Sequence, residues 1–249
     1  MKQFKETFLG IVVLLVFGWL IIYIYNHESS KQNRELAKRI AELSPRRGLP
    51  EGTDGLRQAI ALYEDQIERN VREGAQTGVY WKILGIRLAD SKMHNDALAA
   101  FERAIYFNSE DPTIFYLTAV SAGLVAKDKI GFTANDEREK VRYFTLSENS
   151  YKRALELDVT YTKAMYGLAV LYVFELDRPR DAIVQLERYM QIQPSDVQAM
   201  FVLARAYFAT EQYSQAVNTY DRIIERTRDK NVKESALELR DIVQGVLYE

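Results

Sequence analysis

The sequence predicts an all-α protein: an α-solenoid of helix–turn–helix repeats behind an N-terminal transmembrane helix. Two observations lead to this fold class. An uncharged run of 18 residues extends from Phe8 to Tyr25, and beyond it a pattern of large and small apolar residues recurs every 34 or 35 residues. Hydrophobic residues make up 47% of the 249-residue chain and charged residues 27%, which is ordinary for a protein with a packed core.

The uncharged run is long enough to cross a bilayer, because a helix of 18 residues extends about 27 Å. Trp19, Tyr23 and Tyr25 gather toward its C-terminal end, where aromatic rings favour the headgroup level. A cleaved signal peptide is the alternative, but no small-x-small cleavage site comes after the run. We therefore expect residues 1–27 to form a short tail and a single membrane span in contact with the lipid bilayer of a cell membrane.

Positive charges flank this run on both sides. Lys2 and Lys5 precede it, and four basic residues come after it within a short distance: Lys31, Arg34, Lys38 and Arg39. The count alone leans toward a cytoplasmic body, but a short basic tail before an uncleaved apolar run is typical of a signal anchor that exports the C-terminal body of the chain. We expect the repeats to be extracytoplasmic, and periplasmic if the cell is bacterial, with a cytoplasmic location as the alternative.

Residues 28–52 are expected to form a stalk and a linker. Leu36, Ile40 and Leu43 have helical spacing, which indicates a short amphipathic helix. Prolines and glycines then interrupt the pattern, at Pro45, Gly48, Pro50, Gly52 and Gly55.

Residues 53–230 contain the repeats, each with two sets of residues that share one helical face. The sets of the first helices are Trp81/Leu84/Gly85/Leu88, Phe115/Thr118/Ala119/Ala122, Met165/Leu168/Ala169/Tyr172 and Met200/Leu203/Ala204/Tyr207. The sets of the second helices are Ala97/Phe101/Ala104, Ser147/Tyr151/Ala154, Ala182/Leu186/Tyr189 and Ala216/Tyr220/Ile223. Small residues such as Gly85, Ala169 and Ala204 are predicted to let paired helices approach closely.

Three departures from strict repetition shape the predicted array. An Ala59/Tyr63 pair indicates half a repeat before about four repeats, and an insertion of 16 residues lies near 127–142. The insertion is expected either to form a loop on the binding face or to be solvated sequence that lengthens a helix. Residues 231–249 are expected to form a helix that caps the last repeat.

The period and the residue types resemble the tetratricopeptide repeat (TPR) family, whose signature has the order W-x2-L-G-x2-Y, A-x3-F and P. The resemblance covers about Thr53 to Arg228. It implies a concave groove, lined by the first helices, that binds proteins or peptides. The positions expected to face this groove are Lys82, Ile86, Tyr116, Val120, Lys163, Tyr166, Val170, Phe174, Phe201, Arg205 and Phe208.

This set is mostly apolar, so an amphipathic helix or an extended apolar peptide is the expected ligand. A carboxylate clamp, which the family builds from paired Lys and Asn, is not expected, because Ile86 stands where the clamp needs Asn. The alternative is that the aromatic residues are core, or are covered by the half repeat or the C-terminal helix.

Several classes of function are excluded by composition. The chain has no cysteine, so thiolate metal sites and cysteine nucleophiles are absent, and its two histidines, His27 and His94, are far apart. The sequence contains no phosphate loop, no G-x-S-x-G and no H-E-x-x-H. We expect no enzyme, no cofactor and no metal.

Charge points to protein partners. Residues 1–47 hold eight basic and four acidic residues, so the remaining 202 hold 25 basic and 31 acidic ones, a net of −6. An acidic body without a basic stripe argues against nucleic acid. We expect a membrane-tethered scaffold or adaptor that helps to assemble an envelope or membrane complex, with possible self-association. A chaperone-like quality-control factor for exported or unfolded chains and a structural subunit of a larger membrane machine are the alternatives.

Overall fold

A computed structural model describes residues 52–129 and 133–248, in which all regular structure is helical. The expected membrane span at Phe8–Tyr25 and the stalk of residues 28–51 lie outside these ranges. Among the helices of the described ranges, none is both long and apolar enough to cross a membrane. The chain divides into two units, residues 1–72 and residues 73–249, and the helical repeats lie in the second.

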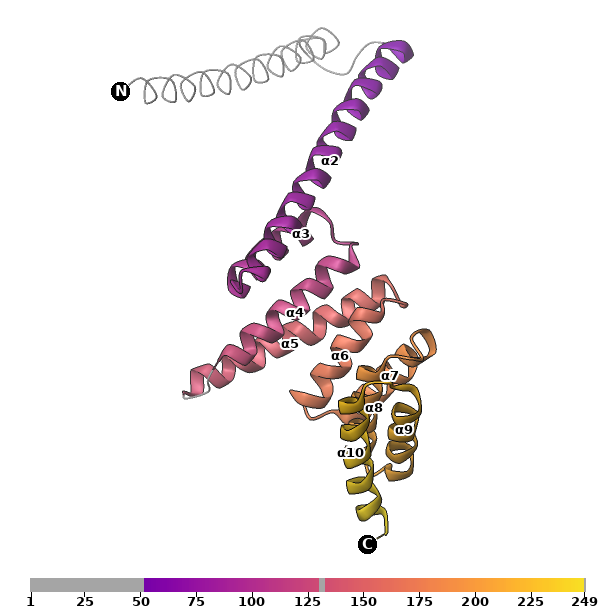
Figure 1. Cartoon of the computed structure of the whole chain (residues 1–249). Helices are drawn as coiled ribbons and strands as arrows, with labels where there is room; N and C mark the ends of the chain where they lie inside the picture. The colour runs from indigo at the N-terminus through magenta and orange to yellow at the C-terminus, as the bar shows by residue number, and fades with distance from the viewer. Residues whose placement is uncertain (1–51, 130–132, 249) are drawn as a thin grey trace, which may run out of the picture. The chain divides into compact units, whose positions relative to one another are not determined.

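Figure 1 labels the helices in chain order. They are α2 (Gly52–Asp90), α3 (His94–Phe107), α4 (Pro112–Asp128), α5 (Ala134–Leu157), α6 (Thr162–Phe174), α7 (Pro179–Ile192), α8 (Val197–Ala209), α9 (Tyr213–Arg226) and α10 (Lys230–Tyr248). In the repeats α4 packs on α5, α6 on α7 and α8 on α9. The first helices also touch one another, because α6 contacts both α4 and α8, as the solenoid prediction requires.

The long helix α2 differs from the sequence expectation. Residues 52–90 form one continuous helix of 39 residues, so no turn separates the predicted half repeat at Ala59/Tyr63 from the first repeat at Trp81. The intervening residues contain no proline, and i,i+4 ion pairs such as Arg69–Asp65 and Arg72–Glu68 (2.7 Å) support the helix. The expected half repeat is therefore the N-terminal part of α2.

The insertion near 127–142 lengthens two helices. Helix α4 continues to Asp128, and α5 begins at Ala134 and runs for 24 residues, against 14 in α7 and in α9. Thr133 starts α5 with a capping box, since its hydroxyl accepts from the backbone N–H of Asp136 and the Asp136 carboxylate accepts from the Thr133 N–H. The alternative in which the insertion extends a helix is what the described part of this segment shows.

Small residues allow close packing within the pairs, as the sequence predicted. A Cβ added at Gly85 would lie 2.4 Å from the ring of Phe101, which is fully buried. Ala169 and Ala204 are also fully buried. Leu84 departs from the pattern and is 43% exposed, since α2 and α3 form the first described pair and no described pair stacks before them.

The turns inside the repeats share a left-handed residue. Lys92 and Glu211 both have φ near 62°, and Asp177 has φ 51°. After Lys92, the N–H of Met93 donates to the Leu88 carbonyl (2.9 Å), which closes the end of α2 in a Schellman arrangement. After Glu211, the N–H of Gln212 donates to the Tyr207 carbonyl (2.9 Å) in the same way at the end of α8. The turns of the two repeats therefore have the same backbone geometry.

Candidate functional site

An apolar groove of about 450 Å³ lies between α6 and α8, which are the first helices of the last two repeats, and the terminal helix α10. We call it the α6–α8–α10 groove. Its lining residues are Tyr166, Val170, Phe174, Gln198, Phe201, Val202, Arg205, Phe208, Tyr220, Leu239, Ile242 and Val243. Six of the eleven residues expected to face a groove meet here: Tyr166, Val170, Phe174, Phe201, Arg205 and Phe208.

The groove presents large apolar side chains to water. Phe174 is 49% exposed and Phe208 is 37% exposed, and on the α10 side Ile242 is 54% exposed. Tyr166 and Phe201 lie deeper and pack against the main core. The Phe201 ring also contacts the Tyr220 ring edge to face, with ring centroids 6.1 Å apart. The floor is therefore core, as the alternative predicted, whereas the rim is available to a ligand.

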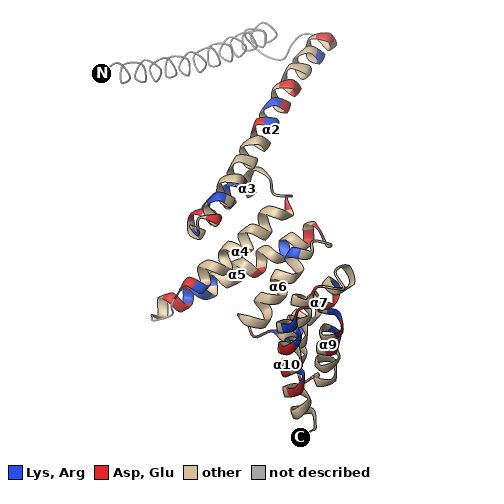
Figure 2. Ribbon diagram, viewed as in Figure 1, with Lys and Arg blue, Asp and Glu red and all other residues tan. Residues whose placement is uncertain are grey.

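Local sequence explains why the groove is apolar. Helix α6 carries one charged residue, Lys163, and α8 carries one, Arg205. Figure 2 shows the same contrast, with α4 and α6 largely free of charged residues while the N-terminal parts of α2 and α5 carry many. First helices that touch neighbours on several sides need apolar residues around most of their circumference.

Arg205 is the one charged residue among the described residues that line the groove. Its guanidinium carbon lies 5.0 Å from the centroid of the Phe174 ring, so the cation rests on an aromatic face at the rim. Burial raises the pKa of Tyr220, and the nearby charge of Arg205 opposes that rise. The groove thus combines apolar walls with one exposed positive charge.

The other expected groove residues lie elsewhere. The Lys82 ammonium is 2.8 Å from the carboxylate of Asp111, and both side chains are mostly buried. Asp111 caps α4 by accepting from the Thr113 N–H at 2.8 Å. Burial raises the pKa of Asp111, but hydrogen bonds from Lys82 and Thr113 outweigh that and hold it below its ordinary value. Lys82 therefore joins two repeats, and it does not line the α6–α8–α10 groove.

The remaining four are divided between core and surface. Ile86 packs on the small cluster around Phe101, and Val120 packs on the main core. Tyr116 is half-buried, with its ring centroid 5.6 Å from that of Tyr161. Lys163 is exposed at the first turn of α6. None of the four lines the α6–α8–α10 groove.

The sequence analysis did not include residues of α10 among those that face the groove, although it gave covering of the groove aromatics by the C-terminal helix as an alternative. Ala236 and Val243 of α10 are buried, as a helix that caps the last repeat requires. Leu239 and Ile242 instead form a wall of the groove. The signal was a second apolar face on this helix, since Leu239, Ile242 and Val246 have spacings of three and four.

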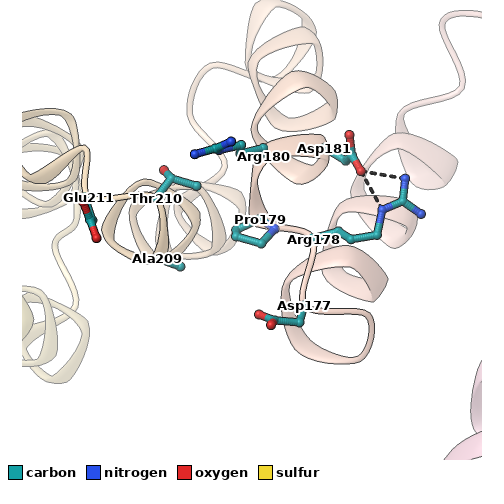
Figure 3. A pocket seen from close by; sticks show the side chains of 8 residues that line it. All are labelled: Asp177, Arg178, Pro179, Arg180, Asp181, Ala209, Thr210 and Glu211. Atoms are coloured by element: carbon teal, nitrogen blue, oxygen red, sulfur yellow. Dashed lines mark hydrogen bonds and ion pairs between the residues drawn. The ribbon is translucent and has the colours of Figure 1, made fainter.

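A second hollow, of about 510 Å³, lies where the α6–α7 turn meets the α8–α9 turn (Figure 3). Its walls are polar, and Arg178 donates from Nε to Asp181 at 2.6 Å, as the dashed lines show. The same guanidinium donates to Glu148 at 2.7 Å, and Glu148 also accepts from Lys152 and from the hydroxyl of Tyr172. Arg178, which lines the hollow, therefore connects the α6–α7 turn to α5, where its partner Glu148 also holds Tyr172 of α6.

The described ranges contain no candidate metal-binding cluster. Across residues 52–129 and 133–248, no group of three or more His, Asp and Glu side chains is placed to hold a metal ion. The expectation that the protein is not an enzyme stays a prediction.

Comparisons with known proteins agree with this architecture. Residues 173–237 match a family model described as tetratricopeptide repeat. Anaphase-promoting complex subunit 3 of Schizosaccharomyces pombe (strain 972 / ATCC 24843) is 27% identical over 142 residues, which are 57% of this chain. The match spans only 19% of that relative's own length.

Solved structures show the same fold. The MamA RS-1 ArsTM double mutant superposes with a TM-score of 0.54 at 13% identity, covering 69% of this chain and 95% of that one. MamA 41-end from Desulfovibrio magneticus RS-1 gives a TM-score of 0.50 at 14% identity, covering 69% and 96%. Residues 173–237 thus match the tetratricopeptide repeat family, and the solved structures share the α-solenoid fold.

Proposed function

We propose that this chain is a TPR scaffold or adaptor that binds an apolar segment of a partner protein in the α6–α8–α10 groove. The observation that carries the proposal is the rim of the groove, where Phe174, Phe208 and Ile242 are all more than one-third exposed around a concave surface. Contiguous exposed apolar patches on a protein surface mark interaction sites or ligand-binding grooves. The volume of about 450 Å³ is within the range of ligand pockets.

The chemistry of the groove defines the partner segment. Its apolar walls suit two or three large side chains spaced along one face of a helix or alternating along an extended strand. Arg205 adds a cation at the rim, so a carboxylate next to those side chains is favoured over an amine. We therefore expect an amphipathic segment that carries large apolar residues and at least one Asp, Glu or C-terminal carboxylate.

A phage library of random 12-residue peptides, selected on the full-length chain, would test this. Peptides enriched in selection should share apolar residues beside an acidic one, and a synthetic copy of the best should be used for binding by fluorescence anisotropy. Phe174→Ala and Phe208→Ala should each weaken binding about 30-fold, equivalent to about 2 kcal/mol for a hot-spot residue. Val184→Ala is the matched control, because Val184 is 53% exposed on α7, outside the groove.

Three outcomes would decide the matter. If no peptide is enriched, or if the groove variants bind as wild type does, the groove is not the binding site. If binding falls only in proportion to thermal stability, the two phenylalanines act as core. A wide range of weakly bound apolar peptides with no shared acidic residue would favour the chaperone-like alternative.

We further propose that residues 8–25 tether this scaffold to a membrane, where it would help to assemble a membrane or envelope complex on the extracytoplasmic side. The support is the length of the uncharged run and its aromatic end. Carbonate extraction of membranes should leave the full-length chain in the pellet, and release into the supernatant would refute the tether. Protease added to intact cells or spheroplasts should cleave the repeats if they are extracytoplasmic.

A further inference from the structure

The N-terminal part of α2 carries a stripe of large apolar side chains on one face. Its members are Leu56, Ile60, Tyr63, Ile67 and Val71, which are between 38% and 65% exposed. Spacings of four, three, four and four keep them on one side of the helix. We call this set the α2 stripe. It shares no residue with the α6–α8–α10 groove.

The rest of this part of α2 is built to face water. Arg57 bonds Asp54 at 3.1 Å, and Arg69 and Arg72 pair with Asp65 and Glu68, all with exposed side chains. Figure 2 shows these charges along the helix. Removing large apolar side chains from water favours association, so five of them on one face of α2 favour a partner helix.

We propose that the α2 stripe pairs with the α2 stripe of a second copy of this chain in antiparallel orientation, with Ile60 of each copy against Tyr63 of the other. The pairing is isologous: Leu56 of each copy then meets Ile67 of the other, and the same surface is used twice. The alternation of stripe residues by three and four is the spacing that helix pairs use to interdigitate side chains.

Charge on the two edges of the stripe favours the antiparallel arrangement. By helical spacing, Arg57 and Glu64 lie on one edge, whereas the other edge carries the uncharged Ala59, Gln66 and Asn70. In an antiparallel pair like edges meet, so Arg57 of one copy faces Glu64 of the other, and symmetry makes two such pairs. In a parallel pair the charged edge would face the uncharged edge and neither ion pair would form.

Sedimentation equilibrium of the full-length chain in detergent micelles should show a dimer in wild type. Ile67→Asp places a charge in the middle of the stripe and should raise the dissociation constant at least about tenfold, since 1.4 kcal/mol is tenfold. Val141→Asp is the matched control, because Val141 is 62% exposed on α5 and lies outside the stripe. Circular dichroism should be unchanged in both variants.

Charge reversal tests the orientation. Arg57→Glu and Glu64→Arg should each weaken the dimer, and the double variant should recover wild-type affinity. The two positions are about 10.5 Å apart along one helix, too far to pair within it, so recovery requires contact between copies. The chain has no cysteine, so Ile60→Cys mixed with Tyr63→Cys should form a disulfide-linked dimer, whereas Ile60→Cys alone should form little.

The proposal is overturned by any of four results. These are a wild-type monomer at all concentrations, a dimer that persists in Ile67→Asp, no recovery in the double charge variant, or efficient self-linkage of Ile60→Cys, which indicates a parallel pair. A monomer in which Ile67→Cys reacts slowly with maleimide would assign the stripe to another occupant, a segment of the same chain or the micelle. Peptide binding in the groove is measured separately and is unaffected by these outcomes.

Discussion

Gly85→Ala is a single-atom test of the packing between α2 and α3. The added Cβ would lie 2.4 and 2.6 Å from two ring carbons of Phe101, far inside ordinary van der Waals contact. Phe101 is fully buried, and its neighbours in the cluster include Ala97, Ala104 and Ile114, so any shift of the ring disturbs buried neighbours. Either this ring must shift or α2 and α3 must move apart to accept one methyl group.

The magnitude comes from two opposing effects. Overpacking a close-packed site costs about 1–3 kcal/mol, and the fixed ring places this site at the upper end. Replacing a helical glycine with alanine returns about 1 kcal/mol of helix stability. We expect a net loss of about 2 kcal/mol for Gly85→Ala.

Gly74→Ala is the matched control on the same helix. Its added Cβ would lie 3.8 Å from a Phe107 carbon, which is ordinary contact, so only the gain of about 1 kcal/mol in helix stability applies. Urea unfolding of the full-length variants, monitored by circular dichroism, should separate the two by about 3 kcal/mol. Phe101→Leu should partly rescue Gly85→Ala, because it removes the atoms in conflict. Equal stability of the two alanine variants would show that the α2–α3 register is wrong.

Three further predictions concern stability. Burial raises the pKa of Glu148, but hydrogen bonds from its partners outweigh burial and hold the pKa below the ordinary value of 4.5. The contribution of Glu148 to the free energy of unfolding is therefore present above pH 4.5 and lost as pH falls through the lower folded-state pKa. In urea titrations at a series of pH values, Glu148→Gln should reduce this loss of stability in acid. Burial and the bond to Asp196 raise the pKa of Tyr189 to about 12, so stability present below pH 10 should be lost toward pH 12, and Tyr189→Phe should not show that loss. Glu211→Gly relieves a φ of 62° and should raise the free energy of unfolding by up to about 1 kcal/mol, whereas an unchanged melting temperature would argue against a strained turn.

Much of the fold could be predicted from periodicity. Apolar residues at helical spacing place the repeat helices, and the small residues Gly85, Ala169 and Ala204 mark where paired helices come close. Gly167 shows the limit of that reasoning. Its added Cβ would lie 2.6 Å from the Tyr151 ring, a contact that the repeat pattern does not include.

The candidate site could be predicted only in part, for a related reason. The sequence places Phe174, Arg205 and Phe208 off the packing face of their helices, and the structure gathers them in one groove. It also assigned Lys82 to the groove, where the structure instead joins it to Asp111 across 29 positions. Helical spacing gives the face on which a side chain lies, but it does not give the neighbour that this face meets.

The sequence by itself determined the all-α class, the repeat period and the apolar character of the first helices, because these depend on which residues recur along one chain segment. The structure also shows that α2 runs unbroken through the expected half repeat and that the insertion extends α4 and α5, outcomes that local ion pairs and the Thr133 capping box support. Only the tertiary structure decided that α10 supplies Leu239 and Ile242 to the groove. That outcome depends on contacts between residues far apart in sequence. Burial of one face of α10 leaves its other apolar face beside α8, and no local pattern records which face is chosen.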